Sequence, residues 1–168
     1  MKNLSFLVVM FGIISLSQAQ KSLASLEDVM PDDNELTVLN YEYLSSVQES
    51  VTPADAKFLE GIVSQWDAIS SPQFDGRNEL FKTRFSSNKG SIEVSYDDKG
   101  TIVRTKEVYR DFALPIQLKQ VIFQRYQDWN IIQSKYYVTY NIDQALVKYF
   151  EITIENGDEQ KRIKINGA

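Results

Sequence analysis

Tight turns divide the second half of the chain into alternating segments, and this pattern constrains the fold most strongly. Ser87–Gly90 and Asp97–Gly100 each separate runs in which apolar and polar residues alternate, and Asn156–Asp158 does the same near the C-terminus. Alternation with a period of two is typical of strands, and such short turns join antiparallel neighbours. The chain is therefore expected to contain antiparallel hairpins.

Six strands and two helices are predicted. The helices cover residues 52–69 and residues 114–129. The expected apolar face of the first helix is formed by Phe58, Leu59, Ile62, Val63, Trp66 and Ile69. Both helices have a proline in a first-turn position and apolar residues at helical spacing. The order is helix, three strands, helix, three strands. It indicates an α+β fold: an antiparallel sheet of about six strands with two helices packed on one face. The expected strands cover residues 80–85, 91–96, 101–109, 132–140, 146–154 and 161–165.

The N-terminus has the pattern of an export signal. A short basic start is followed by an apolar run from Leu4 to Leu16 and by the small-residue site Ser17-Gln18-Ala19. This predicts a signal peptide over residues 1–19, cleaved between Ala19 and Gln20. The apolar run is shorter than the roughly 20 residues of a spanning helix. A periplasmic or secreted protein without membrane insertion after cleavage is expected.

Residues 20–51 are the least periodic part of the chain. They hold an acidic cluster around Pro31 and predict a loosely ordered, solvated leader. A calcium-binding loop is the alternative, but such a loop needs a central glycine, and none lies there. The remaining residues, 52–168, are predicted to form a single α+β domain. The acidic residues of the cluster are Glu27, Asp28, Asp32, Asp33 and Glu35.

The chain has no histidine and no cysteine. Catalytic triads, Cys-His pairs, zinc fingers and disulfide frameworks are therefore excluded. No catalytic residue, metal site or cofactor is assigned from the sequence. The expectation is a protein that binds rather than catalyses.

The charge balance bears on the partner. The net charge is −5 at pH 7, and it becomes −6 once the signal, with its single cation Lys2, is removed. An acidic balance argues against nucleic acid and against an anionic membrane surface. The predicted partner is a protein of the cell envelope or the extracellular space.

Several segments resemble a known family. They are Ile92–Val103, Leu114-Pro115, Tyr126–Trp129, Tyr137–Tyr140 and Tyr149–Ile152. Together they resemble the secreted PepSY-like proteins of Bacteroidetes, a group also described as similar to β-lactamase-inhibitor-protein domains. The resemblance spans about residues 91–166 and rests on turn and core residues. It implies that residues 52–168 form a small exported binding or inhibitory module, and it carries no active site across.

By similarity to other short exported proteins of this kind, a nicotinate-nucleotide adenylyltransferase activity is a further hypothesis. That chemistry uses a histidine-containing phosphate motif beside a Rossmann strand. Because the chain has no histidine and no βαβ start, the sequence does not support this activity.

The late strands predict a binding surface. Tyrosines among a few charges are the composition expected of a recognition surface. The alternative is that cross-strand tyrosine and threonine pairs only stiffen the sheet. The candidate residues are Lys135, Tyr137 and Thr139 on one strand and Val147, Tyr149 and Glu151 on the next.

Three other readings compete with a binding surface. Glu93 and Glu107, on neighbouring strands, would serve a carboxylate-dependent hydrolase if they faced each other, but their polar neighbours favour a solvated position. Asp97-Asp98 before Gly100 could suggest a metal loop, although a hairpin turn explains it better. An envelope structural component, docked through the leader 21–51, is the third reading.

Overall fold

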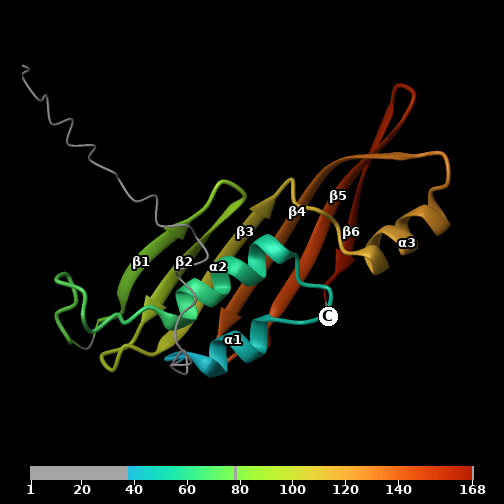
Figure 1. Ribbon diagram of the computed structural model, residues 1–168. Coiled ribbons are helices and arrows are strands. Elements are labelled where there is room, and N and C mark those ends of the chain that lie inside the picture. The colour runs from blue at the N-terminus through green and yellow to red at the C-terminus, as the bar shows by residue number, and fades with distance from the viewer. Residues whose placement is uncertain (1–37, 78, 168) are drawn as a thin grey trace, which may run out of the picture. The chain divides into compact units, whose positions relative to one another are not determined.

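The protein, as a computed structural model, is described over residues 38–77 and 79–167. The predicted signal peptide and the acidic cluster of the leader lie outside these residues. Figure 1 shows the order of the elements along the chain. They are α1 (Tyr41–Val47), α2 (Ala54–Gln65), β1 (Phe81–Ser86), β2 (Gly90–Tyr96), β3 (Ile102–Arg110), α3 (Ile116–Arg125), β4 (Asn130–Asn141), β5 (Val147–Asn156) and β6 (Glu159–Asn166).

The six strands form one antiparallel sheet in the order β1-β2-β3-β4-β5-β6. Each strand therefore pairs with its neighbour in the sequence, and α3 is inserted between β3 and β4. The predicted α+β class and the six-stranded antiparallel sheet are confirmed.

The turn between β2 and β3 shows why the hairpins form where the sequence predicts them. The Asp97 carboxylate oxygen Oδ1 accepts the backbone N–H groups of Lys99, at 3.0 Å, and Thr101, at 2.8 Å. Gly100 has a φ of 77°, a conformation that glycine adopts at little cost. Asp97 and Gly100 are thus turn residues, as the preferred reading of this segment predicts.

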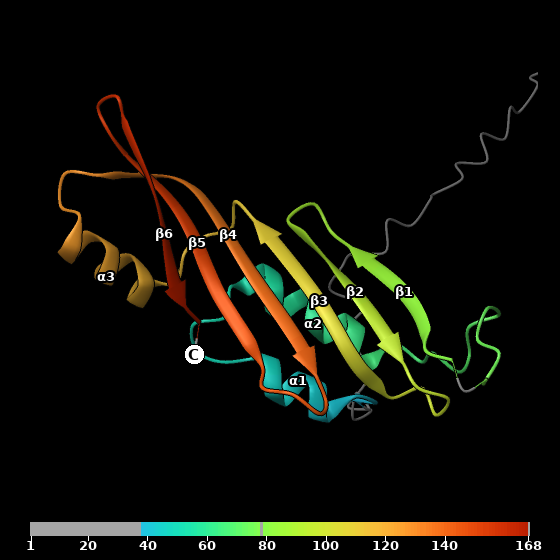
Figure 2. The ribbon, with the colours of Figure 1, turned by 180° about the vertical axis from the view of Figure 1, so that it is seen from behind.

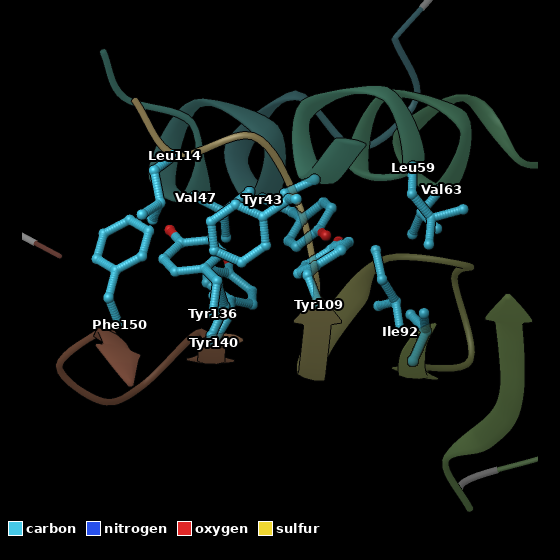
Figure 3. Close-up of a cluster of buried hydrophobic side chains, with 14 of the residues drawn as sticks. Tyr43, Val47, Leu59, Val63, Ile92, Tyr109, Leu114, Tyr136, Tyr140 and Phe150 are labelled. Atoms are coloured by element: carbon cyan, nitrogen blue, oxygen red, sulfur yellow. The ribbon is translucent and has the colours of Figure 1, made fainter. Parts of the chain in front are cut away.

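The core lies between helices and strands. Helix α2 contacts β1 and β2, and α1 contacts β4. In Figure 2 the sheet stands in front of α1 and α2. Figure 3 shows side chains from the helices, among them Val47 and Leu59, meeting strand residues such as Ile92, Tyr136 and Phe150. Burial of these apolar groups is the main stabilising contribution.

Helix α1 differs from the expected loosely ordered leader. Residues 38–51 fall in the same compact unit as the sheet. Tyr43 and Val47, four residues apart and so on one face of α1, are fully buried. Just before the helix, the Asn40 side chain accepts the backbone N–H of Ile102 at 2.7 Å. The boundary expected at residue 52 is therefore too late, because buried apolar side chains and hydrogen bonds of Asn40, Tyr43 and Gln48 hold this segment.

Helix α2 is rotated relative to the expected apolar face. Phe58 is 69% exposed and Ile62 is 43% exposed, whereas Leu59 and Val63 point into the core. Apolar residues form two adjacent rows on this helix. The row through 59 and 63 continues with the fully buried Ala56, whereas Ala54, in the row of Phe58 and Ile62, is exposed. The helix also ends at Gln65 rather than near residue 69.

Helix α3 buries Leu118 and Ile122 and lies beside β6 (Figures 1 and 2). It ends at Arg125, earlier than the predicted residue 129. Ile132, the first residue of the strand predicted over residues 132–140, is 42% exposed, because the register of β4 shifts between Ile131 and Gln133. Within the described residues, none of the helices has the length and apolar character needed to cross a bilayer.

Candidate functional site

The candidate binding residues lie directly opposite one another in two paired strands. In the register of β4 and β5, Tyr137 pairs with Tyr149, and the pairs on either side complete the set of six. All six side chains alternate with buried residues such as Val138 and Phe150, so they share the outer face of the sheet. The flanking pairs are Lys135 with Glu151 and Thr139 with Val147.

The two tyrosine rings are stacked. Their centroids are 4.8 Å apart, with planes inclined by 19°. The Nζ atom of Lys164, on β6, lies 3.7 Å from the centroid of the Tyr149 ring. Partial burial, with the nearby Tyr137 and Glu151 as further causes, raises the pKa of Tyr149 above its usual value. The two rings thus pack against each other across the strands and are part of the outer surface of the sheet.

Ion pairs border the tyrosines on one side. The carboxylate oxygen Oε1 of Glu151 lies 3.6 Å from Lys135 Nζ and 3.7 Å from Arg162 Nε. Thr139 and Val147, on the other side, are exposed. The surface is therefore charged at one end of the tyrosine pair and uncharged at the other.

Basic side chains extend over the outer face well beyond these residues. Strand alternation places most of the sheet's lysines and arginines there, with only Glu93, Glu151 and Glu155 as acidic neighbours. Arg110 and Lys135 even lie directly opposite each other, an arrangement that is repulsive by itself. The basic residues of the outer face are Lys82, Arg84, Arg104, Lys106, Arg110, Lys135, Arg162 and Lys164.

The two glutamates considered for hydrolysis do not face each other. Glu93 pairs with Lys106 on the outer face, whereas Glu107 pairs with Ile92 and is only 1% exposed. The expectation of a solvated Glu107 is therefore wrong. Residues 107 and 109 are two positions apart on β3, so their side chains point to the same side of the sheet. The large ring of Tyr109 is buried in the core, and Glu107 is therefore buried with it.

Glu107 accepts three hydrogen bonds inside the core. Its Oε1 atom accepts the hydroxyls of Tyr43 at 2.9 Å and Thr105 at 2.7 Å, and its Oε2 atom accepts the hydroxyl of Tyr109 at 3.0 Å. Burial raises the pKa of this carboxyl, and the hydroxyls of Thr105, Tyr43 and Tyr109 oppose the rise.

A second buried carboxyl, Glu60 on α2, lies beside Glu107. Glu60 is fully buried, and among the described residues neither of its carboxyl oxygens has a hydrogen-bond partner. Burial, and after it the charge of Glu107, raises the pKa of Glu60 from 4.5 to about 8. Glu60 is therefore neutral at pH 7, which limits the cost of placing two carboxyls together in the core.

This acid pair has no opening for a substrate. Both carboxyls are closed off from solvent by core residues, and the surrounding hydroxyls belong to the buried residues Tyr43, Thr105 and Tyr109. The described residues also contain no group of three acidic side chains placed to hold a metal ion. The acid pair therefore affects the free energy of unfolding and the way in which that free energy changes with pH.

Sequence reasoning missed Glu60 and the extent of the basic face. Glu60 sits one position after Leu59 on a helix whose inward row was assigned through Phe58. The basic face did leave a signal, because Arg104, Lys106 and Arg110 share one parity along their strand, and so do Lys82 and Arg84 along theirs.

Comparison with known proteins finds no relative. No family model matches the chain, and searches of curated proteins and of solved structures find no match either.

Proposed function

We propose that the chain is an exported, non-enzymatic binding module that recognises a protein through the outer face of its sheet. The contact centre is the six-residue surface of β4 and β5, which is defined by Lys135, Tyr137, Thr139, Val147, Tyr149 and Glu151. The single observation that carries the proposal is the stacked Tyr137–Tyr149 pair on that face. Preorganised rings contribute contact area to an interface at little entropic cost.

The proposal gives the two faces of the sheet different roles. In it, the helices predicted for residues 52–69 and 114–129 both cover the inner face and leave the outer one to a partner. In support, the inner face carries the buried row of β5, for example Phe150 and Ile152, while outward residues such as Tyr149 and Thr153 keep partial exposure.

Export and the absence of catalysis complete the proposal. The N-terminal pattern through Ala19 and the resemblance of residues 91–166 to PepSY-like proteins favour an exported binding or inhibitory role. The separation of Glu93 and Glu107 onto opposite faces argues against hydrolysis by that pair.

The experiment compares partner capture by matched variants. The full exported chain is immobilised, and proteins retained from the envelope and extracellular fractions of the producing cell are quantified by mass spectrometry. The test variant is Tyr137→Ala/Tyr149→Ala. The control is Phe58→Ala/Phe123→Ala, which removes two exposed rings from α2 and α3. A partner should be retained by wild type and control and reduced at least ~10-fold by the test variant, since central aromatic residues carry much of the binding energy.

A second variant separates binding from folding. Val147→Glu leaves both rings in place and adds a longer, negatively charged side chain at an exposed position of the six-residue surface, opposite Thr139. The midpoint of its urea unfolding should equal that of wild type, and it should nevertheless fail to retain the partner. Identical partner lists for all four proteins would contradict the proposal.

A further inference from the structure

Strands β1 and β3 present a cluster of positive charge on the outer face. Lys82 and Arg84 of β1 and Arg104 and Lys106 of β3 are all exposed. The strand between them, β2, contributes a single charged residue, Glu93. Four cations therefore surround one carboxylate in a chain whose net charge is −5.

The register makes the cluster regular. Glu93 lies between Arg84 and Lys106, and Ser95 lies between Lys82 and Arg104. Alternate residues on one strand are about 7 Å apart, and β1 and β3, separated by one strand, are about 10 Å apart. The four cations thus occupy the corners of a near-rectangle on the sheet.

The side chains of the cluster line a hollow on the outer face of the sheet. Side chains of all four cations and Glu93 line one hollow, and Arg84 also borders a second one with Lys89 and Arg110.

Arg84 Nη1 lies 3.8 Å from Glu93 Oε1, in a pair that is exposed and so weak. The other three cations, Lys82, Arg104 and Lys106, make no ion pair with any residue that the structure describes. Like charges held this close repel one another, and an anionic partner would relieve the repulsion.

The arrangement of the rings favours a protein over a single-stranded nucleic acid as that partner. The outer faces of β1, β2 and β3 carry no aromatic residue, so bases would find no stacking platform there. The nearest rings on the outer face, Tyr137 and Tyr149, stack on each other, and Lys164 covers Tyr149. In an extended peptide, carboxylates at alternate positions repeat at about 7 Å, which matches the spacing of the cations.

The cluster is continuous with the proposed contact centre, because Lys106 pairs with Thr139 across β3 and β4. We infer that the partner is a protein with an acidic segment, whose carboxylates bind over Lys82, Arg84, Arg104 and Lys106 beside the six-residue surface. This inference rests on the proposed function and specifies the chemistry of its partner.

The test uses a defined acidic probe. A fluorescein-labelled peptide of alternating glutamate and serine is titrated with the full exported chain at low and physiological salt, and anisotropy is read. An otherwise identical glutamine–serine peptide is the uncharged probe. The variant Arg104→Gln/Lys106→Gln is compared with Lys57→Gln/Lys119→Gln, which changes the net charge equally but on α2 and α3.

The dissociation constant should rise about tenfold for Arg104→Gln/Lys106→Gln, as expected for two exposed ion pairs lost together. It should stay within about twofold of wild type for the helix control, and salt should weaken binding less in the sheet variant than in wild type. Equal binding of the glutamine peptide, no binding of the glutamate peptide, or equal losses in both variants would overturn the inference.

Two further arms exclude other anions. A single-stranded oligonucleotide and phosphatidylglycerol vesicles of matched charge should bind more weakly than the glutamate peptide, and tighter binding of either would overturn the inference. The captured partner distinguishes the two proposals. If Tyr137→Ala/Tyr149→Ala loses the partner but Arg104→Gln/Lys106→Gln keeps it, the acidic segment is wrong and the binding face stands. If both variants keep it, the binding face is wrong.

Discussion

The hydroxyl of Tyr43 donates a 2.9 Å hydrogen bond to Oε1 of Glu107, a residue 64 positions later in the chain. The bond joins α1 to the central strand β3, and both residues are buried. Tyr43 also meets Tyr140 of β4 edge to face, with ring centroids 5.5 Å apart. Helix α1 has only seven residues, so these tertiary contacts rather than its own hydrogen bonds hold it in place.

Tyr43→Phe should therefore lower the free energy of unfolding by about 1–3 kcal/mol. The ring contacts stay, but a buried carboxylate loses one of its three donors. Tyr41→Phe is the matched control on the same helix, because Tyr41 is 69% exposed. Urea denaturation followed by far-UV circular dichroism measures both. Equal stability of the two variants would show that the Tyr43 hydroxyl contributes nothing.

The sheet was predictable from local signals. Turn residues such as Asp97 and Gly100 act through their own backbone and neighbouring N–H groups, so their effect can be read from a few positions. Strand alternation, as in β4 and β5, then fixes which side chains share a face. For this reason the alternation of the two strands is enough to place Tyr137 and Tyr149 on one face, where the register pairs them.

Long-range contacts were not predictable in the same way. Nothing in the sequence near Tyr43 indicates a hydrogen bond to Glu107, and Glu60 reads as a solvated helix residue. Whether Tyr43 and Glu60 are buried depends on which row of residues on α1 and on α2 faces the sheet. That choice is made by packing against distant strands, for example by Trp66 of the α2 end against Phe85 and Tyr96.

The buried acid pair gives the protein a stability that depends on pH. The pKa of Glu60 is about 8 in the folded protein and near 4.5 when exposed. Between these values the folded state holds a proton that the unfolded state releases. The stabilisation is complete below about pH 4.5 and is lost as pH rises through 8, with a slope of at most about 1.4 kcal/mol per pH unit for this proton. The raised pKa of Glu107 acts in the same direction.

Glu60→Gln should weaken this dependence, because its side chain has a similar shape and does not ionise. Urea unfolding at intervals from pH 5 to pH 9 should show wild type losing stability with pH and the variant losing less. Asp55→Asn, on the same helix, should follow wild type. A wild-type stability that is constant or increases over this range would contradict the assigned protonation of Glu60.

Replacing Gly90 and Gly61 by alanine should change the stability of the protein in opposite directions. A Cβ atom at Gly90 would lie 2.5 Å from both the Tyr109 ring and the Val108 carbonyl oxygen, so Gly90→Ala should destabilise by roughly 1–3 kcal/mol. At Gly61, inside α2, no atom lies within 4 Å of the added Cβ, and Gly61→Ala should stabilise by about 1 kcal/mol. Thermal unfolding of the two variants checks the packing at the start of β2 and along α2. Changes of the same sign would show one of these packing descriptions to be wrong.

The most direct test of the binding face is site-specific photo-cross-linking in the producing cell. A photoreactive residue replaces Thr139 on the outer face or Gln117 on α3, both of which are exposed. Illumination should join a partner protein to the Thr139 site and leave the Gln117 site without an adduct. An adduct at Gln117 with none at Thr139 would contradict recognition through the sheet.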